Sequence, residues 1–221
     1  MVTISVTMIG TTDLLPNRLI SVHFPKAAGT SLLRQLTELL PDQVHLDYAH
    51  DPLVESGNEV AVFPDDKRVV HGHFKPQRYS QRDAILITFL RHPVSNVISI
   101  FYYWLDCPEH GNPVHTKFLV ERPDIFQFAA WPEFSGLMSK VYFVGFDMAR
   151  FDFIGFHSSY AEDVARLGTL LGLPLSADIF ENKGRPCEER EPLEASSSAI
   201  SRLTDLLVDD VRFYNSARAR F

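Results

Sequence analysis

The segment Ala84–Leu90, with the sequence AILITFL, constrains the fold more than any other part of the chain. Apolar side chains occupy both alternating sets of positions, so a strand formed here would be buried on both faces. Such a strand belongs in the middle of a parallel sheet that helices cover. Arg91, His92 and Pro93 end the apolar run, and residues 94–105 then show helical periodicity with a proline near the first turn.

Other short apolar segments alternate with helical patterns along the chain. Besides Ala84–Leu90, the predicted strands are residues 19–24, 60–63, 69–71 and 151–156. Besides 94–105, the predicted helices are residues 30–40, a helix that ends near 171 with Gly172 as its cap, and an amphipathic stretch from about 195 to 221. This alternation predicts one α/β domain over residues 1–221, with a largely parallel sheet.

Two expectations concern local structure. Ser159 and Glu162 have the spacing of a capping box, in which each side chain bonds a free backbone N–H of the other residue. Residues 41–68, 106–122 and 180–192 lack a regular pattern and are expected to form loops.

Charge and cysteine content narrow the functional classes. Lys and Arg number 21 against 28 Asp and Glu, a net charge of −7, whereas proteins that bind nucleic acid by bulk electrostatics are usually basic. No window reaches the roughly 20 apolar residues of a membrane span, and Met1 to Thr12 lacks the basic and apolar regions of a signal peptide. Cys107 and Cys187 are expected to be reduced thiols. We therefore expect a cytoplasmic protein without nucleic-acid partners.

Residues 25–31, Pro-Lys-Ala-Ala-Gly-Thr-Ser, join a predicted strand to a predicted helix. The first N–H groups of a helix have no partner within it, and together with the helix dipole they form an anion site. Gly29 would allow a tight turn close to a ligand, Thr30 and Ser31 add hydroxyl donors, and Lys26 adds a positive charge. The segment predicts binding of a phosphate or a similar oxyanion, although lysine precedes glycine here, unlike in the nucleotide P-loop. The alternative is an ordinary helix start with a solvated lysine.

Arg91 follows the predicted central strand directly, and Ser99 lies two turns into the next helix. An arginine at the carboxyl end of a central strand is well placed for a bidentate bond to phosphate. The alternative is a structural arginine that pairs with a carboxylate of a neighbouring element.

His71 and His73 flank Gly72 at the end of a short predicted strand. Side chains two residues apart on a strand point to the same side, and an imidazole with a near-neutral pKa can take a proton from a hydroxyl. A metal pair is a competing interpretation, but no third ligand at a characteristic spacing accompanies the two histidines, and no metal is predicted. The structural alternative is a pair of hydrogen-bonded histidines at a strand end.

Taken together and in this order, three segments resemble the motifs of sulfotransferases that use 3′-phosphoadenosine 5′-phosphosulfate (PAPS). The segments are residues 25–31, His71-Gly72-His73-Phe74, and residues 90–99 with the aromatic residues at 101–103. The branch that they resemble most includes carbohydrate sulfotransferases such as the heparan and dermatan 2-O-sulfotransferases. The resemblance extends to residues 151–156 and 180–186, so it covers nearly the whole chain. It implies a P-loop-like, three-layer α/β domain with a central, mostly parallel sheet flanked by helices.

The resemblance also implies roles for individual residues. The residues expected to hold the 5′-phosphosulfate are Lys26, Ala28, Gly29, Thr30 and Ser31. Those expected to hold the 3′-phosphate are Arg91 and Ser99. Lys183 and Arg185 match a late loop that closes over the nucleotide. His73 matches the catalytic base, with His71 beside it.

The reaction that this resemblance implies is in-line transfer of a sulfuryl group from PAPS to an acceptor hydroxyl, with 3′-phosphoadenosine 5′-phosphate (PAP) as product. His73 would remove the hydroxyl proton, and Lys26 would stabilise charge on the departing phosphate oxygen. Enzymes of this family do not depend on a metal, so no metal cofactor is expected. The expected acceptor is a carbohydrate.

Two other functions stay open. A P-loop kinase of a small molecule would need an acid that holds Mg²⁺ at a strand end, whereas the strongest predicted strand ends at Arg91. A non-catalytic nucleotide-binding protein would keep the binding motifs without turnover. The aromatic-rich residues 118–131 likewise have two interpretations: they line an acceptor cleft by stacking on sugar rings, or they form helix core, which is the favoured interpretation.

Overall fold

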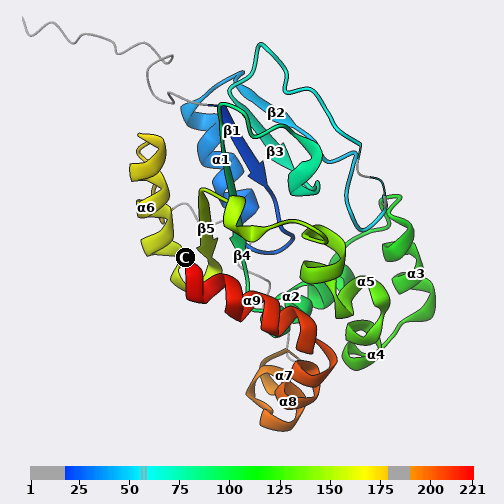
Figure 1. The fold of residues 1–221 in the computed structure, drawn as a ribbon. Coiled ribbons are helices and arrows are strands. Elements are labelled where there is room, and N and C mark those ends of the chain that lie inside the picture. The colour runs from blue at the N-terminus through cyan, green and yellow to red at the C-terminus, as the bar shows by residue number, and fades with distance from the viewer. Residues whose placement is uncertain (1–17, 56, 58, 179–189) are drawn as a thin grey trace, which may run out of the picture.

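The computed structural model of the chain describes residues 18–55, 57, 59–178 and 190–221. A five-stranded parallel sheet lies at its centre (Figure 1). The strands are β1 (Arg18–Val22), β2 (Val44–Leu46), β3 (Val69–Gly72), β4 (Ala84–Leu90) and β5 (Phe153–Phe156), in the order β2-β3-β1-β4-β5. The expected α/β class, with a parallel sheet flanked by helices, is confirmed.

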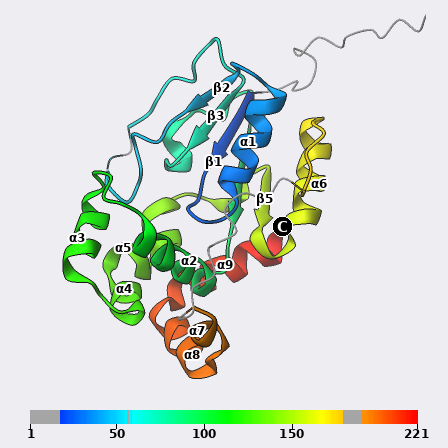
Figure 2. The same cartoon turned by 180° about the vertical axis from the view of Figure 1, so that it is seen from behind.

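The helices form two groups around this sheet (Figures 1 and 2). Alongside the strands lie α1 (Gly29–Leu39) and α6 (Tyr160–Leu171). Beyond the carboxyl ends of the strands lie α2 (Pro93–Asp106), α3 (Pro113–Glu121), α4 (Ile125–Ala130), α5 (Pro132–Ser135), α7 (Arg190–Ala195), α8 (Ser197–Leu206) and α9 (Val208–Arg220). A π-helical turn, Leu137–Tyr142, follows α5.

The strand Ala84–Leu90 lies between β1 and β5, as its two apolar faces require. Its residues Leu86, Ile87 and Leu90 are fully buried, and so are Leu19 and Ile20 of the neighbouring β1. The chain leaves β1 toward β3 and β2 on one side, while β4 and β5 lie on the other. The strand order therefore reverses between β1 and β4, and in open parallel sheets ligands bind beyond the carboxyl ends at such a reversal.

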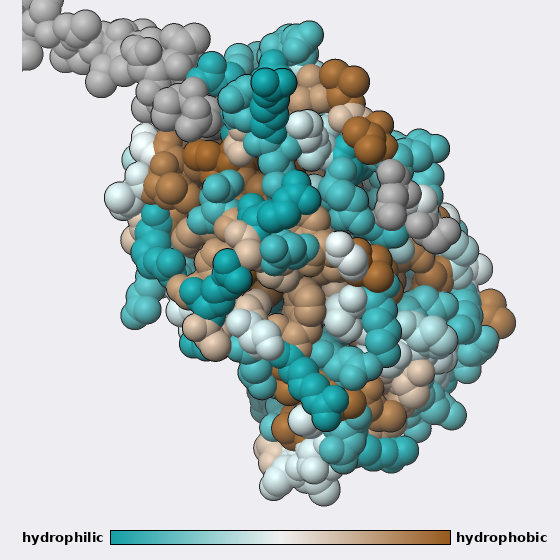
Figure 3. Space-filling model, viewed as in Figure 1, coloured by the Kyte–Doolittle hydropathy of each residue, from teal (hydrophilic) through white to brown (hydrophobic). Residues whose placement is uncertain are grey.

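The structure differs from the sequence expectation at residues 60–63, which do not form a strand of the sheet. Val60 and Val62 are 79% and 87% exposed, and Ala61 forms only an isolated bridge to Tyr79. The reason is that the Ala61 N–H donates to the Arg78 carbonyl at 2.7 Å, so this segment pairs with residues 78–79 and not with an edge of the sheet. On the face shown in Figure 3, hydrophobic residues are scattered in small groups over a mostly hydrophilic surface.

The expected loops also contain regular structure. Residues 41–68 include β2, and residues 106–122 include α3. Helix α3 begins where the Asn112 side chain accepts hydrogen bonds from the backbone N–H groups of Val114 and His115, with Pro113 at the first helical position. Of the third expected loop, 180–192, residues 180–189 lie outside the described part of the chain, and residues 190–192 belong to α7. The predicted C-terminal helix is divided into α8 and α9 at the buried Leu207.

The expected capping box of Ser159 and Glu162 is wrong. The Ser159 hydroxyl donates to the Asp163 carboxylate at 2.8 Å, so it does not cap α6. The same carboxylate accepts from the Phe156 backbone N–H at 2.8 Å and from the Arg166 guanidinium at 2.7 Å. Asp163 thus joins the end of β5 to α6. The cap at the other end of α6, Gly172, is as expected.

No helix in the described part of the chain has the length and apolar character needed to cross a membrane.

Asp163→Ala should lower the free energy of unfolding by about 2–4 kcal/mol, because it removes charge-assisted bonds and leaves the buried Phe156 N–H without its acceptor. Glu162→Ala, at the exposed neighbouring position, should change that free energy by less than about 0.5 kcal/mol. Urea denaturation of both variants measures the difference. Equal losses would contradict the role of Asp163.

Candidate active site

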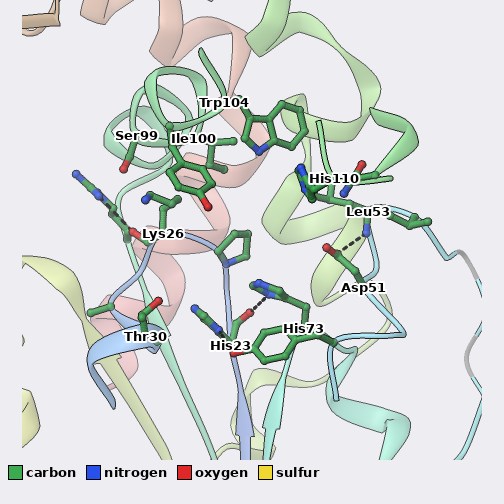
Figure 4. Close-up of a pocket in the computed structure, with 18 of the residues that line it drawn as sticks. His23, Lys26, Thr30, Asp51, Leu53, His73, Ser99, Ile100, Trp104 and His110 are labelled. Carbon is green, nitrogen blue, oxygen red and sulfur yellow. Dashed lines mark hydrogen bonds between the residues drawn. The ribbon is translucent and has the colours of Figure 1, made fainter. Parts of the chain in front are cut away.

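A cavity of about 540 Å³ lies beyond the carboxyl ends of β1, β3 and β4 (Figure 4). This volume is in the range of small-molecule and cofactor sites. Its walls come from the turn after β1, the residues that follow β2 and β3, helix α2, and the loop before α3.

The cavity brings together most of the residues that the sequence singled out. Those that line it are Lys26, Ala28, Gly29, Thr30, Ser31, His73, Arg91 and Ser99. His71 is not part of the lining. Lys183 and Arg185 lie outside the described residues. Segments more than 60 residues apart in the sequence therefore meet at one site.

The turn after β1 has an unexpected construction. Lys26 and Ala28 adopt left-handed backbone conformations, with φ of 56° and 77°, whereas Gly29 is the first residue of α1. The expectation that Gly29 shapes the turn is therefore wrong. A Cβ atom at position 29 would overlap the imidazole of His23, so glycine is needed there because the ring packs against the helix start.

The N-terminus of α1 opens toward the cavity. Ala28, its N-cap residue, has no side chain that could bond the first N–H groups of the helix. These donors have no partner inside the helix either, and they carry the positive end of the helix dipole. Thr30 is exposed, whereas the Ser31 side chain is fully buried. The backbone of residues 29–31 thus offers donors for an anion.

Two cationic side chains lie beside this helix start. The Lys26 ammonium lies 4.1 Å from the centre of the Tyr103 ring, and the Arg91 guanidinium donates to the Lys26 carbonyl at 3.2 Å. The Nε of Arg91 is buried and has no hydrogen-bond partner among the described residues. In the same part of the chain, no carboxylate lies within ion-pair distance of Lys26 or Arg91. The structural alternative for Arg91, a carboxylate partner, is therefore not realised there.

The pKa values of these cations reflect their crowding. Burial, followed by the charges of Arg91 and Arg190, lowers the pKa of Lys26. Burial and the charge of Arg190 lower the pKa of Arg91 to about 10. Mutually repelling cations in a concave site attract an anion strongly, because a bound anion relieves the repulsion. Lys26, Thr30 and Ser99 lie along this side of the cavity in Figure 4. We call Lys26, Arg91 and the start of α1 the cationic end.

His73 lies in the same cavity, held by two bonds to its Nδ1. This nitrogen is 2.6 Å from the His23 carbonyl oxygen and 3.2 Å from the Tyr142 hydroxyl, which in turn donates to Asp51 at 3.1 Å. Because a carbonyl oxygen only accepts, Nδ1 carries the proton and Nε2 keeps its lone pair. Burial lowers the pKa of His73, against the opposing charge of Asp51. The ring is therefore neutral at pH 7 and able to accept a proton at Nε2.

His71 differs from His73 in its surroundings. It is fully buried, its Nδ1 lies 2.9 Å from the Ser21 hydroxyl, and burial lowers its pKa to about 3. Both rings pack against the ring of His23, with centroid distances of 5.0 Å and 4.4 Å for His71 and His73 respectively. His71 is therefore a neutral packing partner of His23. Between the pair, Gly72 is required because a Cβ there would overlap the backbone carbonyl of Asp47.

Several residues of the cavity were missed from the sequence, namely His23, Tyr48, Asp51, Trp104, His110 and His157. A usable signal existed for His23 and His157, since each directly follows a strand, as Arg91 does. Tyr48 and Asp51 lie in an irregular segment, where no local pattern marks a functional residue. Tyr142, the partner of His73, lies in the π-helical turn and carries no such signal either.

No family model and no curated protein matches the chain. Among solved structures, mouse sulfotransferase SULT7A1 complexed with PAP has a TM-score of 0.45 at 12% identity, covering 92% of this chain and 87% of that one. A sulfotransferase from Alicyclobacillus acidocaldarius has a TM-score of 0.39 at 13% identity, covering 86% of this chain and 95% of that one. At these scores the likeness assigns neither a residue role nor an activity to this chain.

Gly29→Ala should lower the free energy of unfolding by about 1–3 kcal/mol, because the added methyl group overlaps the His23 ring. In the double variant Gly29→Ala/His23→Ala the His23 ring is absent. Gly29→Ala should therefore lower the free energy of unfolding by less in the His23→Ala background than in the wild type. Thermal or urea unfolding of the two single variants and the double variant gives this coupling. Gly57→Ala, where a Cβ meets nothing within 4 Å, is the matched control. Additive losses in the double variant would show that the two residues do not compete for space.

Proposed function

We propose that this protein is a PAPS-dependent sulfotransferase that transfers a sulfuryl group to a hydroxyl of a carbohydrate acceptor in the cytoplasm. The observation that carries the proposal is the pairing of two features in one cavity. One is the cationic end, and the other is the neutral imidazole of His73, with Nδ1 committed to a carbonyl and Nε2 left as a base. The motif resemblance of residues 25–31, 71–74 and 90–99 adds to this support.

The cofactor would bind along the cationic end. Lys26 and the backbone N–H groups of residues 28–31 would hold the 5′-phosphosulfate, and Thr30 adds a hydroxyl donor. Arg91 and Ser99 would hold the 3′-phosphate, for which the unpartnered Nε of Arg91 offers a donor. Lys183 and Arg185, which lie outside the described residues, would add positive charge.

The chemistry follows from this placement. The acceptor oxygen attacks sulfur as His73 Nε2 takes the hydroxyl proton. A new S–O bond forms, and the bond from sulfur to the 5′-phosphate oxygen breaks, which leaves PAP with an additional negative charge. Lys26 and the start of α1 stabilise that charge where it develops. The Tyr142–Asp51 pair beside Nδ1 stabilises the imidazolium that His73 becomes. His71, fully buried, would position His23 and thereby His73.

Among the described residues, the kinase alternative lacks an unengaged acid at the end of a strand that lines the cavity. Asp51 is the one carboxylate among the described residues that line the cavity, and it accepts the Tyr142 hydroxyl and the Leu53 N–H. Asp47, which directly follows β2, is bound to Arg78 at 2.6 Å and to Tyr79 at 2.7 Å. Asp47 is thus engaged by its partners, and Asp51 does not directly follow a strand, where the kinase alternative places the acid that holds Mg²⁺.

The expectation that the aromatic residues of 118–131 form core is borne out for Phe118 and Phe128, which are buried. The cavity instead presents Tyr48 and Tyr103, which are exposed, with the buried Trp104 beside them. Aromatic faces of this kind stack on sugar rings, so we propose that these residues receive the acceptor.

The test of the function is transfer of labelled sulfate from PAPS to a panel of sugars, alcohols and phenols. Absence of transfer despite PAP binding would favour the non-catalytic alternative.

His73→Ala should lower kcat by about 10²–10⁴-fold and leave PAPS affinity nearly unchanged, since the base acts on the acceptor. His45→Ala, outside the cavity, is the matched control and should retain kcat. Rates with labelled PAPS and an acceptor identified in the panel measure both. Near-wild-type kcat in His73→Ala would remove the residue from the reaction.

The wild-type rate should be constant from neutral to weakly basic pH and fall in acid. A base works only when unprotonated, and burial places the pKa of His73 below its ordinary value of about 6.5, so activity is lost as pH falls through that lowered pKa. A pH profile of kcat tests this. A rate that does not fall at any acid pH at which the protein stays folded would argue against an imidazole base.

Arg91→Ala should weaken PAP binding about tenfold or more, because a charge-assisted bond to phosphate contributes roughly 1.5–3 kcal/mol. Arg18→Ala, at the opposite end of β1, is the matched control. Calorimetric titration with PAP measures both variants. Equal affinities of Arg91→Ala and wild type would remove Arg91 from the binding site.

A further inference from the structure

We propose that Cys107, His110 and His115 form a zinc-binding site at the corner between α2 and α3. Each offers one ligand atom, and the three atoms lie within 4.8 Å of one another. This site is independent of the proposed sulfotransferase activity. The sequence alone predicts no metal, and the histidine pair that it offers as a metal pair is His71 with His73.

The spacing of the ligand atoms suits a tetrahedral ion. The Cys107 sulfur lies 3.8 Å from His110 Nδ1. With Zn–S of about 2.3 Å and Zn–N of about 2.0 Å, neighbouring ligand atoms in such a site are about 3.3–3.5 Å apart. His110 is exposed and lies in the short loop between the helices, so its side chain can move toward the other two ligand atoms. Its Nδ1 lies 3.2 Å from the Pro108 carbonyl oxygen, a contact that it would give up on binding an ion.

His115 supplies the observation that points to a ligand. Its ring is fully buried, and its Nε2 lies 3.2 Å from the carbonyl oxygen of Trp104. In a continuing helix that carbonyl would accept from residue 108, but Pro108 has no N–H. Nε2 therefore donates to Trp104, and Nδ1 keeps a lone pair.

Among the described residues, His115 Nδ1 has no hydrogen-bond partner. A buried acceptor without a donor is costly, and a metal ion would satisfy it. An imidazole that donates one N–H to a carbonyl and turns its other nitrogen toward a cation is the usual arrangement of a metal-ligating histidine. His115 is thus already in the protonation state and orientation that a ligand needs.

The donor set selects the metal. One sulfur and two imidazole nitrogens favour zinc over Mg²⁺ or Ca²⁺, which prefer oxygen ligands. On binding, the Cys107 thiol gives its proton to solvent and the thiolate coordinates the ion. Three protein ligands leave the fourth position of a tetrahedral ion to water or another small ligand.

The proposed zinc site lies next to the cavity, because one of its ligands also lines the cavity wall. His110, Gly111 and Asn112 line the cavity, and Figure 4 shows His110 on the side away from Thr30. A bound ion would tie this loop to the end of α2 at Cys107 and to α3 at His115. Zinc would thereby fix the wall of the cavity that lies opposite the cationic end.

The test uses the full chain, freed of metal with a chelator and titrated with Co²⁺ and then Zn²⁺ under reducing conditions. We expect one ion per chain, a thiolate-to-cobalt charge-transfer band, the visible absorption of tetrahedral Co²⁺, and loss of both signals when Zn²⁺ displaces cobalt. Cys107→Ser and His110→Ala, both at the surface or near it, should weaken binding at least tenfold. Cys187→Ser and His45→Ala are the matched controls and should bind as wild type does.

His115→Gln should also weaken binding, and circular dichroism shows whether this buried variant folds. If His115→Gln does not fold, Cys107→Ser and His110→Ala still test whether these side chains bind the metal. A titration without the thiolate band would overturn the proposal. So would an affinity that falls equally in Cys107→Ser and Cys187→Ser. Binding of PAP does not enter any of these readouts, so their failure is distinct from failure of the proposed activity.

Discussion

The parallel pairing of β1 with β3 places His23 next to His73, and the rest of the site depends on this pairing. Val22 and Gly72 are partners in the register, and the His23 N–H donates to the Gly72 carbonyl at 2.8 Å. The next carbonyl, that of His23, then accepts from His73 Nδ1 and so decides which nitrogen of that ring can act as a base. The ring of His23 in turn packs on Gly29, where α1 starts. One backbone register thus links the proposed base to the anion-binding helix.

The site carries positive charge, whereas the molecule as a whole is negatively charged. The chain carries a net charge of −7, yet Lys26, Arg91 and Arg190 influence one another closely enough to lower the pKa values of the first two. Of these three cations, Arg190 has a partner carboxylate, Glu194, at 2.9 Å. Crowded cations disfavour the folded state unless something compensates them, and an anionic ligand such as the proposed one would do so.

The sequence predicted those parts of the fold and site in which a local pattern matches the final contacts. Ala84–Leu90 was identifiable because both of its faces are buried, and Arg91 because it follows that strand. The three-residue strand β2 was not identifiable, since its pairing with β3 depends on tertiary contacts and its own residues are only partly buried. The pattern of Ser159 and Glu162 misled because a stronger acceptor, Asp163, lies one residue further on. Partners such as Tyr142 and Asp51 are 91 residues apart, and no local pattern reports such a contact.

The proposed function requires that the cavity bind a nucleotide with phosphates at both the 3′ and the 5′ position. Thermal stability with PAP, with adenosine 5′-phosphate and with MgATP tests this requirement, because a ligand that binds the folded state raises the melting temperature more the tighter it binds. The account predicts a rise of several degrees with PAP, a clearly smaller rise with adenosine 5′-phosphate, and none with MgATP at equal concentration. Stabilisation by MgATP with none by PAP would contradict the account and favour a kinase.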